Sequence, residues 1–369
     1  MKRHILALML AGAGTFSLSA EYPAYINTGA NHLTGSPLTH KAPAPGQTLK
    51  ILQIGDSHIQ AEMVTNHIRK RLQEKYGNAG RGFMAPLRLA GTNQSHDYRM
   101  TALSYNGQPV PKLRQTRLLK FPWEGPHPGV GGVGVVADSA WSVSMVPLTE
   151  GHTPIRHATV VTSAGVTHTD YDKGVDSLVI TLRPGEAFYG VRTTTGTPGV
   201  EYSAIGNNGA TYSDYGLIKD FHPVLGRVFD PDIVIYSMGT NEGFSTMTDA
   251  EIRQSVNDQL RCIRNTFPGA DVVVWVPNEC QKSSLHGTPR AKEGVYTINA
   301  RVKDAADIIR RAAMDNGATV WDFYEVFGGE GASDRWLEDK KMNTDHIHLL
   351  KAGYEQMGDL FYDALTEQF

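Results

Sequence analysis

A serine near the beginning of the chain and an aspartate–histidine pair near its end carry the residue types that acyl transfer needs. Ser57 follows an apolar, strand-like run in ILQIGDSHIQ, and Asp345 and His348 stand three residues apart in NTDHIHLL. A serine hydroxyl needs an imidazole to take its proton, and the imidazole needs a carboxylate that fixes its tautomer and stabilises its charge. We therefore interpret Ser57, His348 and Asp345 as a candidate catalytic triad.

The residues beside the triad leave some roles open. His346 lies next to Asp345 and is the competing base, although the spacing favours His348. Asp56 precedes the serine, and we expect it to shape the turn by accepting hydrogen bonds from neighbouring amides. His58 follows the serine and either lines the acyl pocket or caps the next helix.

Acyl transfer also needs donors for the oxyanion that forms on the attacked carbonyl. Asn241 in YSMGTNEG follows a strand-like run, and its side-chain amide can donate to such an oxygen. Gly209 in YSAIGNNGATYSD is expected to expose a backbone N–H, and the N–H of Ser57 is the third donor. Gly206 is an alternative to Gly209, which we prefer because Ala-Thr and a predicted helix follow it. Loss of one such donor typically lowers turnover by about 10²–10³-fold.

Strand-like and helix-like segments alternate on both sides of these residues. Residues 49–76 predict a strand followed by a helix, and the alternation resumes from about residue 200. The later segments are strands at 232–239 and 271–277 and helices at 248–267 and 297–317. This pattern predicts a flavodoxin-like, doubly wound parallel sheet with helices on both faces. Sites in such sheets lie outside the carboxyl ends of the strands, which is where the candidate residues stand.

The middle of the chain has a different pattern. From about Leu87 to Tyr189 there is little helical periodicity, and short alternating segments are separated by Gly, Pro and Asp. We expect an all-β sandwich over 87–189, inserted into an α/β domain that comprises 21–86 and 190–369.

The first twenty residues are typical of a secretory signal peptide. MKRHILALMLAGAGTFSLSA has a basic start, an apolar stretch and small residues at its end. The apolar run is shorter than the roughly 20 residues of a membrane span, and no later run reaches that length. The sequence thus predicts an exported soluble protein, periplasmic if the source is a Gram-negative bacterium.

Composition excludes some classes of function. The 369 residues carry a formal net charge of −3 and have no long basic run, so no nucleic-acid partner is expected. The two cysteines, Cys262 and Cys280, could pair in an oxidising compartment or remain as two buried thiols. Neither has a metal-like spacing with histidine, and the predicted chemistry needs no metal or organic cofactor.

The chain resembles the SGNH (GDSL-type) hydrolase superfamily, whose four sequence blocks supply Ser, Gly, Asn and His. The corresponding residues are Ser57 in GDSH, Gly209 in NNGAT, Asn241 in GTNE, and His348 with Asp345 in DHIH. This chain has His58 where Leu is usual after the serine. The resemblance implies a serine ester hydrolase with an oxyanion site formed by Ser57, Gly209 and Asn241.

A closer resemblance is to the secreted peptidoglycan O-acetylesterases of Gram-negative bacteria. These share GDSHIQ, the NGA and GTNE blocks, a DHIHL-type end and an inserted β domain of carbohydrate-binding-module type. The resemblance implies removal of acetyl groups from the C6 hydroxyl of N-acetylmuramic acid in peptidoglycan or muroglycans. Two alternatives stay open: an O-acetyltransferase that uses the same triad, and an inactive protein that binds cell-wall glycan. The sequence does not define the oligomeric state.

Overall fold

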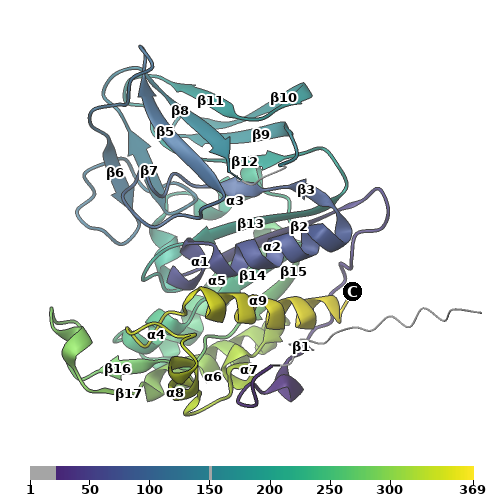
Figure 1. Cartoon of the computed structure of the whole chain (residues 1–369), viewed down its shortest axis with the longest axis vertical. Helices are drawn as coiled ribbons and strands as arrows, with labels where there is room; N and C mark the ends of the chain where they lie inside the picture. The colour runs from purple at the N-terminus through teal and green to yellow at the C-terminus, as the bar shows by residue number, and fades with distance from the viewer. Residues whose placement is uncertain (1–21, 149–151) are drawn as a thin grey trace, which may run out of the picture.

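The computed structural model of the chain describes residues 22–148 and 152–369, so the signal peptide predicted at 1–20 lies outside the described residues. Its described part consists of an α/β layer structure below a body of antiparallel strands (Figure 1). None of the helices in the described ranges is long and apolar enough to cross a membrane.

A seven-stranded sheet forms the centre of the α/β part. Its strands, in spatial order, are β1 (Leu33–Gly35), β18 (Thr319–Trp321), β15 (Asp271–Trp275), β14 (Ile233–Ser237), β2 (Thr48–Gly55), β13 (Gly199–Gly206) and β3 (Asn78–Gly80). The neighbouring strands are parallel except for β1, which pairs antiparallel with β18. The flavodoxin-like sheet predicted from the sequence is therefore present, with an antiparallel edge strand that the prediction lacked.

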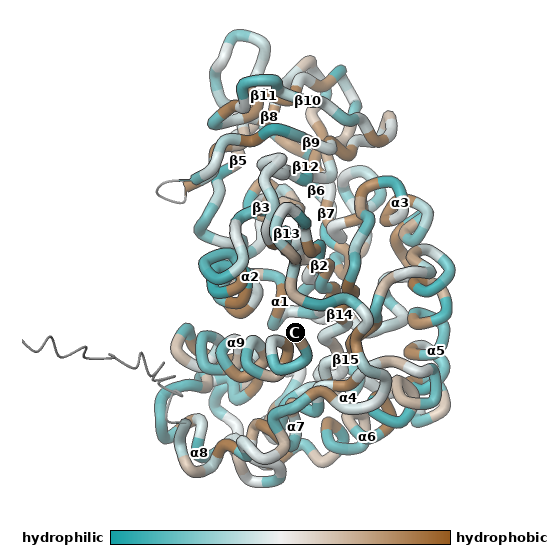
Figure 2. The backbone as a smooth tube through the Cα atoms, turned by 90° about the vertical axis from the view of Figure 1, so that its right-hand side faces the viewer, coloured by the Kyte–Doolittle hydropathy of each residue, from teal (hydrophilic) through white to brown (hydrophobic). Residues whose placement is uncertain are grey.

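Helices cover both faces of this sheet. They are α1 (Ser57–Gln60), α2 (Met63–Tyr76), α3 (Phe221–Val228), α4 (Thr240–Phe244), α5 (Asp249–Thr266), α6 (Ala300–Asp315), α7 (Phe323–Phe327), α8 (Ala332–Glu338) and α9 (Lys351–Thr366), with 3₁₀ turns at Thr28–Ala30, Ser213–Leu217 and Ala291–Glu293. Figure 2 shows α2 and α9 on one side of the sheet and α3 and α5 on the other.

The strand residues alternate between the two cores that these helices close. On β14, Ile233 and Ile235 pack in the cluster that includes α2 and α9. Val234 and Tyr236 pack in the cluster that includes α5 and α6. Because both faces of the strand are covered, all five of its residues are buried, as expected for a central parallel strand.

The middle of the chain forms antiparallel sheets, which we call the β insert (residues 82–194). One sheet has the order β10 (Gly165–Val175), β9 (Ile155–Thr162), β12 (Phe188–Thr194), β7 (Val133–Val136) and β6 (Arg114–Arg117), with β4 (Gly82–Met84) also pairing with β12. The other consists of β11 (Leu178–Leu182), β8 (Trp141–Pro147) and β5 (Tyr98–Ser104). These strands extend a few residues beyond the predicted 87–189 at each end, because β4 and the end of β12 pair with each other.

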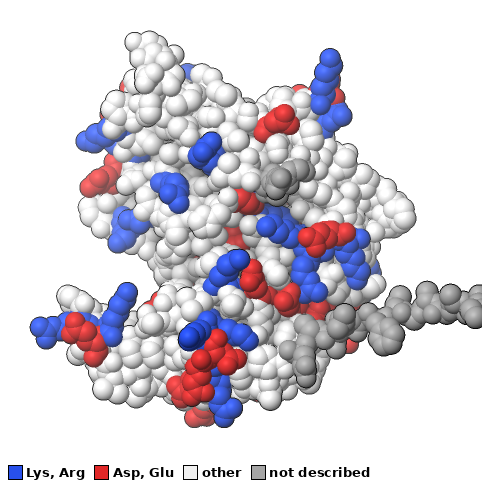
Figure 3. All heavy atoms as spheres, viewed as in Figure 1, with Lys and Arg blue, Asp and Glu red and all other residues white. Residues whose placement is uncertain are grey.

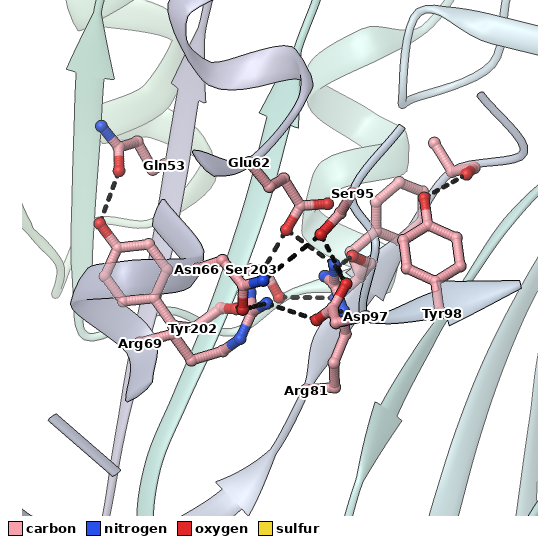
Figure 4. Close-up of polar contacts among 12 residues, drawn as sticks. Gln53, Glu62, Asn66, Arg69, Arg81, Ser95, Asp97, Tyr98, Tyr202 and Ser203 are labelled. Carbon is pink, nitrogen blue, oxygen red and sulfur yellow. Dashed lines mark hydrogen bonds and ion pairs between the residues drawn. The ribbon is translucent and has the colours of Figure 1, made fainter. Parts of the chain in front are cut away.

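A buried ionic cluster joins α2 to the beginning of the β insert (Figure 4). Arg69 lies 3.3 Å from Glu62 and 2.8 Å from Asp97, and Arg81 lies 2.8 Å from Glu62 and 3.0 Å from Asp97. Burial acts to raise the pKa of Asp97, but the two arginines hold it below its usual range. Two cations thus balance two anions, which is the condition for burying such charges.

Candidate active site

The chain turns sharply where β2 ends, and this turn presents Ser57 at the start of α1. A side chain on Gly55 would bring a Cβ within 2.7 Å of the Ser237 carbonyl oxygen, so glycine lets β2 lie against β14 here. Asp56 is buried, and its Oδ1 accepts a hydrogen bond from the His58 N–H at 2.9 Å. The predicted structural role of Asp56 agrees with this contact.

The side chains of Ser57, His348 and Asp345 are linked by two consecutive hydrogen bonds. The Ser57 Oγ is 2.7 Å from His348 Nε2, and His348 Nδ1 is 2.8 Å from Asp345 Oδ2. The other oxygen of Asp345 accepts the backbone N–H groups of Ile347 and His348, each at 2.9 Å. The carboxylate therefore fixes both the turn and the imidazole, which is the arrangement required of a base and its orienting acid.

The negative charge of Asp345 makes the His348 imidazole a better proton acceptor. Burial acts to lower the pKa of His348, but the hydrogen bond and negative charge of Asp345 raise it above the ordinary value of 6.5. Burial acts to raise the pKa of Asp345, but hydrogen bonds from His348 lower it to about 2. Asp345 thus stays ionised across the neutral range.

His346, the competing base, is held away from Ser57. Its ring stacks on Tyr296 with centroids 3.6 Å apart, and its Nδ1 lies 2.6 Å from Gln281 Oε1. Gln281 and Tyr296 belong to a hairpin of β16 (Gln281–Ser283) and β17 (Tyr296–Ile298). His346 has a φ of +60°, so the turn rotates its side chain toward this hairpin while His348 faces the serine.

The predicted oxyanion donors, Ser57, Gly209 and Asn241, all line the pocket beside the Ser57 hydroxyl. Neither the Ser57 N–H nor the Gly209 N–H donates to a protein acceptor within the described residues. The Asn241 amide donates to the Ala210 carbonyl at 2.9 Å, and it lies 3.4 Å from Asp56 Oδ2, which is long for a hydrogen bond. The two backbone N–H groups are thus available to a ligand oxygen, and an Asn241 N–H becomes available when its long contact with Asp56 is exchanged for one with the ligand.

The two candidate glycines differ clearly. Gly206 ends β13, where an added Cβ would lie 2.2 Å from the Gln60 backbone nitrogen, so this glycine serves the packing of α1. Gly209 has a φ of +83° and lies in the turn after β13. A Cβ there would meet only Leu119 Cδ1 at 3.4 Å. The structure brings Gly209, not Gly206, to the pocket beside Ser57. The sequence predicted a helix directly after Gly209. The structure has a 3₁₀ turn there, Ser213–Leu217, and α3 begins only at Phe221.

A pocket of 550 Å³ opens above Ser57. Its wall contains Ser57, Gly209, Asn241 and His348, together with residues that sequence reasoning did not identify, among them Met63, Asn93, Phe244 and His286. Phe244 and His286 contact each other with ring centroids 4.8 Å apart. His286 comes from the β16–β17 hairpin, and no local sequence pattern marked it for this position.

His58 lies behind the pocket and does not form part of its wall. The side chain is buried, its Nδ1 is 3.1 Å from the Tyr354 hydroxyl, and its Nε2 has no partner within the described part of the chain. Burial, followed by the nearby His348, lowers the pKa of His58 to about 3. His58 is therefore a neutral packing residue beneath the candidate base.

The described residues contain neither a disulfide nor a candidate metal site. Cys262 and Cys280 are both free thiols, so the predicted alternative of a disulfide is not realised. Among residues 22–148 and 152–369, no group of three or more His, Cys, Asp or Glu side chains is arranged to hold a metal ion.

Comparisons with known proteins define the class. Residues 176–356 match the model of the GDSL-like lipase/acylhydrolase family. This segment contains Gly209, Asn241, Asp345 and His348 but begins after Ser57. The chain has the SGNH hydrolase fold, and its match to the GDSL-like lipase/acylhydrolase model over just under half of its length supports a carboxylic ester hydrolase of the serine type.

One solved structure agrees with this fold over most of both chains, and others are similar over about half of this chain. A structure described as a peptidoglycan O-acetylesterase in action matches with a TM-score of 0.68 and 23% identity, over 87% of this chain and 91% of that one. A putative GDSL-like lipase from Parabacteroides merdae matches at 0.34 and 15% identity, over 46% and 74%. Est24, a carbohydrate acetylesterase from Sinorhizobium meliloti, matches at 0.34 and 16% identity, over 46% and 80%. No curated protein matches the chain.

Proposed function

We propose that this protein is an exported O-acetylesterase that removes acetyl groups from the C6 hydroxyl of N-acetylmuramic acid in peptidoglycan. The observation that carries the proposal is the 2.7 Å contact between Ser57 Oγ and His348 Nε2, with Asp345 behind the imidazole. This contact points to acyl transfer through an acetyl-serine intermediate.

In the acylation half, Ser57 Oγ attacks the acetyl carbonyl carbon while His348 Nε2 takes the hydroxyl proton. Negative charge gathers on the carbonyl oxygen, which accepts hydrogen bonds from the N–H groups of Ser57 and Gly209. The Asn241 N–H that lies 3.4 Å from Asp56 is the third donor, because its contact to Asp56 is weak. When the carbon–oxygen ester bond breaks, His348 gives its proton to the leaving sugar hydroxyl.

In the deacylation half, water enters the site that the sugar hydroxyl has left. His348 takes a proton from the water, and the resulting hydroxide attacks the acetyl carbonyl of the acyl-serine. The Ser57–acetyl bond breaks, acetate leaves, and the proton returns to Ser57 Oγ. Asp345 stays ionised throughout and stabilises the imidazolium that forms in each half.

Two observations support the substrate class. The pocket is wide, at 550 Å³, and it is lined by amide and hydroxyl groups such as Asn93, Asn241 and Thr240 as well as apolar surface. The polar groups of this wall can hydrogen-bond sugar hydroxyls, and its apolar surface can pack against a sugar ring face or an acetyl methyl group. The fold similarity to a peptidoglycan O-acetylesterase extends over the β insert as well as the α/β part, since it covers 87% of the chain.

The test is acetate release from purified O-acetylated peptidoglycan. We expect the protein to release free acetate, and we expect acetyl transfer to added chito-oligosaccharide to be minor. Transfer that exceeds acetate release would replace the hydrolase with an O-acetyltransferase. Absence of both, with Ser57 unlabelled by a serine-reactive sulfonyl fluoride, would favour a glycan-binding protein without activity.

A further inference from the structure

One loop of the β insert reaches the candidate oxyanion site. This loop connects β6 to β7 and runs from Leu118 to Gly132. A Cβ on Gly209 would lie 3.4 Å from Leu119 Cδ1, so the loop and the glycine are in contact range. Figure 1 shows β6, β7 and the β16–β17 hairpin on the same side of the molecule as α1 and α4. The outline of the space-filling view is indented between the β6–β7 part above and the β16–β17 hairpin below (Figure 3).

A second cavity lies along this loop, next to the pocket beside Ser57. The second cavity measures 100 Å³ and is lined by Arg117, Leu118, Leu119 and Lys120. Asn208 belongs to the walls of both cavities. The two cavities therefore adjoin at Asn208, and Lys120 lines the one farther from Ser57.

An aromatic platform follows directly after Lys120. Phe121 is 60% exposed, and its ring stacks on Trp123 with centroids 4.8 Å apart and an angle of 29° between the planes. The edge of His127 packs against Trp123 at 5.1 Å, and the Trp123 indole N–H donates to the Leu118 carbonyl at 3.3 Å. These contacts hold Trp123 from behind, while Phe121 presents an open face to solvent.

The loop and the last residue of β6 each carry a cation without a carboxylate partner. Lys120 and Arg117 form no salt bridge with any residue in the described ranges, and Arg117 donates only to the Gly91 carbonyl. By contrast, Arg114 on the same strand is paired with Asp138 at 2.7 Å. Unpaired cations beside an open aromatic face favour a ligand with both an apolar face and carboxylates.

We propose that Phe121 and Trp123, with Lys120 beside them, form a subsite for the sugar next to the acetylated one in a glycan strand. A pyranose ring presents its C–H groups to the aromatic face, which carries the negative part of the ring quadrupole. Lys120, which lines the cavity adjoining the pocket, pairs with a lactyl or peptide carboxylate of the acetylated N-acetylmuramic acid itself, because the neighbouring N-acetylglucosamine carries none. This subsite rests on the proposed function, because it binds the same substrate at its next residue.

The test compares a short and a long substrate in the full chain. For each variant, the ratio of kcat/KM on an O-acetylated glycan strand to that on a small aryl acetate is measured. We expect Phe121→Ala and Trp123→Ala to lower this ratio at least tenfold, mainly through KM, and Lys120→Gln to lower it severalfold. Tyr105→Ala is the matched control, because Tyr105 is an 87% exposed aromatic of the β insert outside both cavities.

The outcomes separate the two proposals. A wild-type protein that hydrolyses aryl acetate but not acetylated peptidoglycan would overturn the proposed function, and the subsite with it. A wild-type protein active on peptidoglycan whose Phe121 and Trp123 variants keep the wild-type ratio would overturn the subsite alone. A fall in the ratio for Tyr105→Ala as large as for Phe121→Ala would also overturn it, since the effect would then not be local.

Discussion

The ring centroids of His58 and His348 lie 5.2 Å apart, yet the pKa values of the two imidazoles are shifted in opposite directions. Burial lowers the pKa of His58 to about 3, whereas Asp345 raises the pKa of His348 above its ordinary value. A neutral ring beneath the base adds no positive charge that would oppose protonation of His348. His58, which stands where the SGNH resemblance expects leucine, thus follows the proposed nucleophile without adding a second base.

If His58 packs rather than reacts, its replacement should affect stability more than activity. His58→Leu and Tyr354→Phe each remove one partner of the 3.1 Å hydrogen bond. In urea unfolding, we expect the double variant to lose about 1 kcal/mol less than the sum of the single losses, the usual value of such a bond. A His58→Leu variant with intact folding but no aryl acetate hydrolysis would contradict this role.

The pH dependence of turnover should report His348. The base must be neutral to accept the serine proton, and its pKa is raised above 6.5, so kcat/KM should rise with pH to a midpoint above 6.5. Asp345→Asn removes the charge that raises this pKa, so the midpoint should move to lower pH. The plateau should also fall by about 10²–10⁴-fold, because the imidazole loses its tautomer control. A midpoint that does not move would show that another group titrates.

Replacement of His348 should lower the activity far more than replacement of the neighbouring His346. His346 contacts Tyr296 and Gln281, and only His348 contacts Ser57. We expect His348→Asn to lose at least about 10³-fold in kcat, as expected of a lost general base. His346→Asn should retain at least a tenth of the activity, because Asn tolerates the positive φ at this position. Comparable losses in the two variants would contradict the proposed role of His348 as the base.

The buried ionic cluster of Glu62, Arg69, Arg81 and Asp97 should contribute to the free energy of unfolding. Arg69→Met leaves Glu62 and Asp97 with Arg81 alone, and breaking a buried pair typically costs about 3–5 kcal/mol. Arg253→Met is the control, because the Arg253–Asp315 pair is about half exposed and should contribute less than about 1 kcal/mol. Equal free energies of unfolding for the two variants would contradict the structural importance of the cluster.

Local patterns were sufficient to predict much of the α/β part. The helix expected at 248–267 is observed as Asp249–Thr266, with Thr248 and Glu251 forming a reciprocal capping box. The strand expected at 271–277 begins at Asp271 as predicted. Helix periodicity and caps depend on neighbours in sequence, so such elements can be recognised without knowledge of tertiary contacts.

The residues that complete the pocket could not be predicted in this way. Leu119 reaches Gly209 only because the β insert packs beside the α/β part, and His286 reaches Phe244 only through the β16–β17 hairpin. These contacts join residues distant in sequence, and no periodicity or cap signal encodes them. The same holds for β1, a three-residue strand whose pairing with β18 depends on the finished sheet.

If Ser57 is the nucleophile, a serine-reactive sulfonyl fluoride should label this residue and abolish hydrolysis. Intact-protein mass spectrometry should detect one adduct per chain after treatment of the wild type with a serine-reactive sulfonyl fluoride, with aryl acetate hydrolysis lost in parallel. Ser57→Ala should gain no adduct, show no hydrolysis above background, and unfold at the wild-type temperature. Hydrolysis that persists in a folded Ser57→Ala variant would contradict the account.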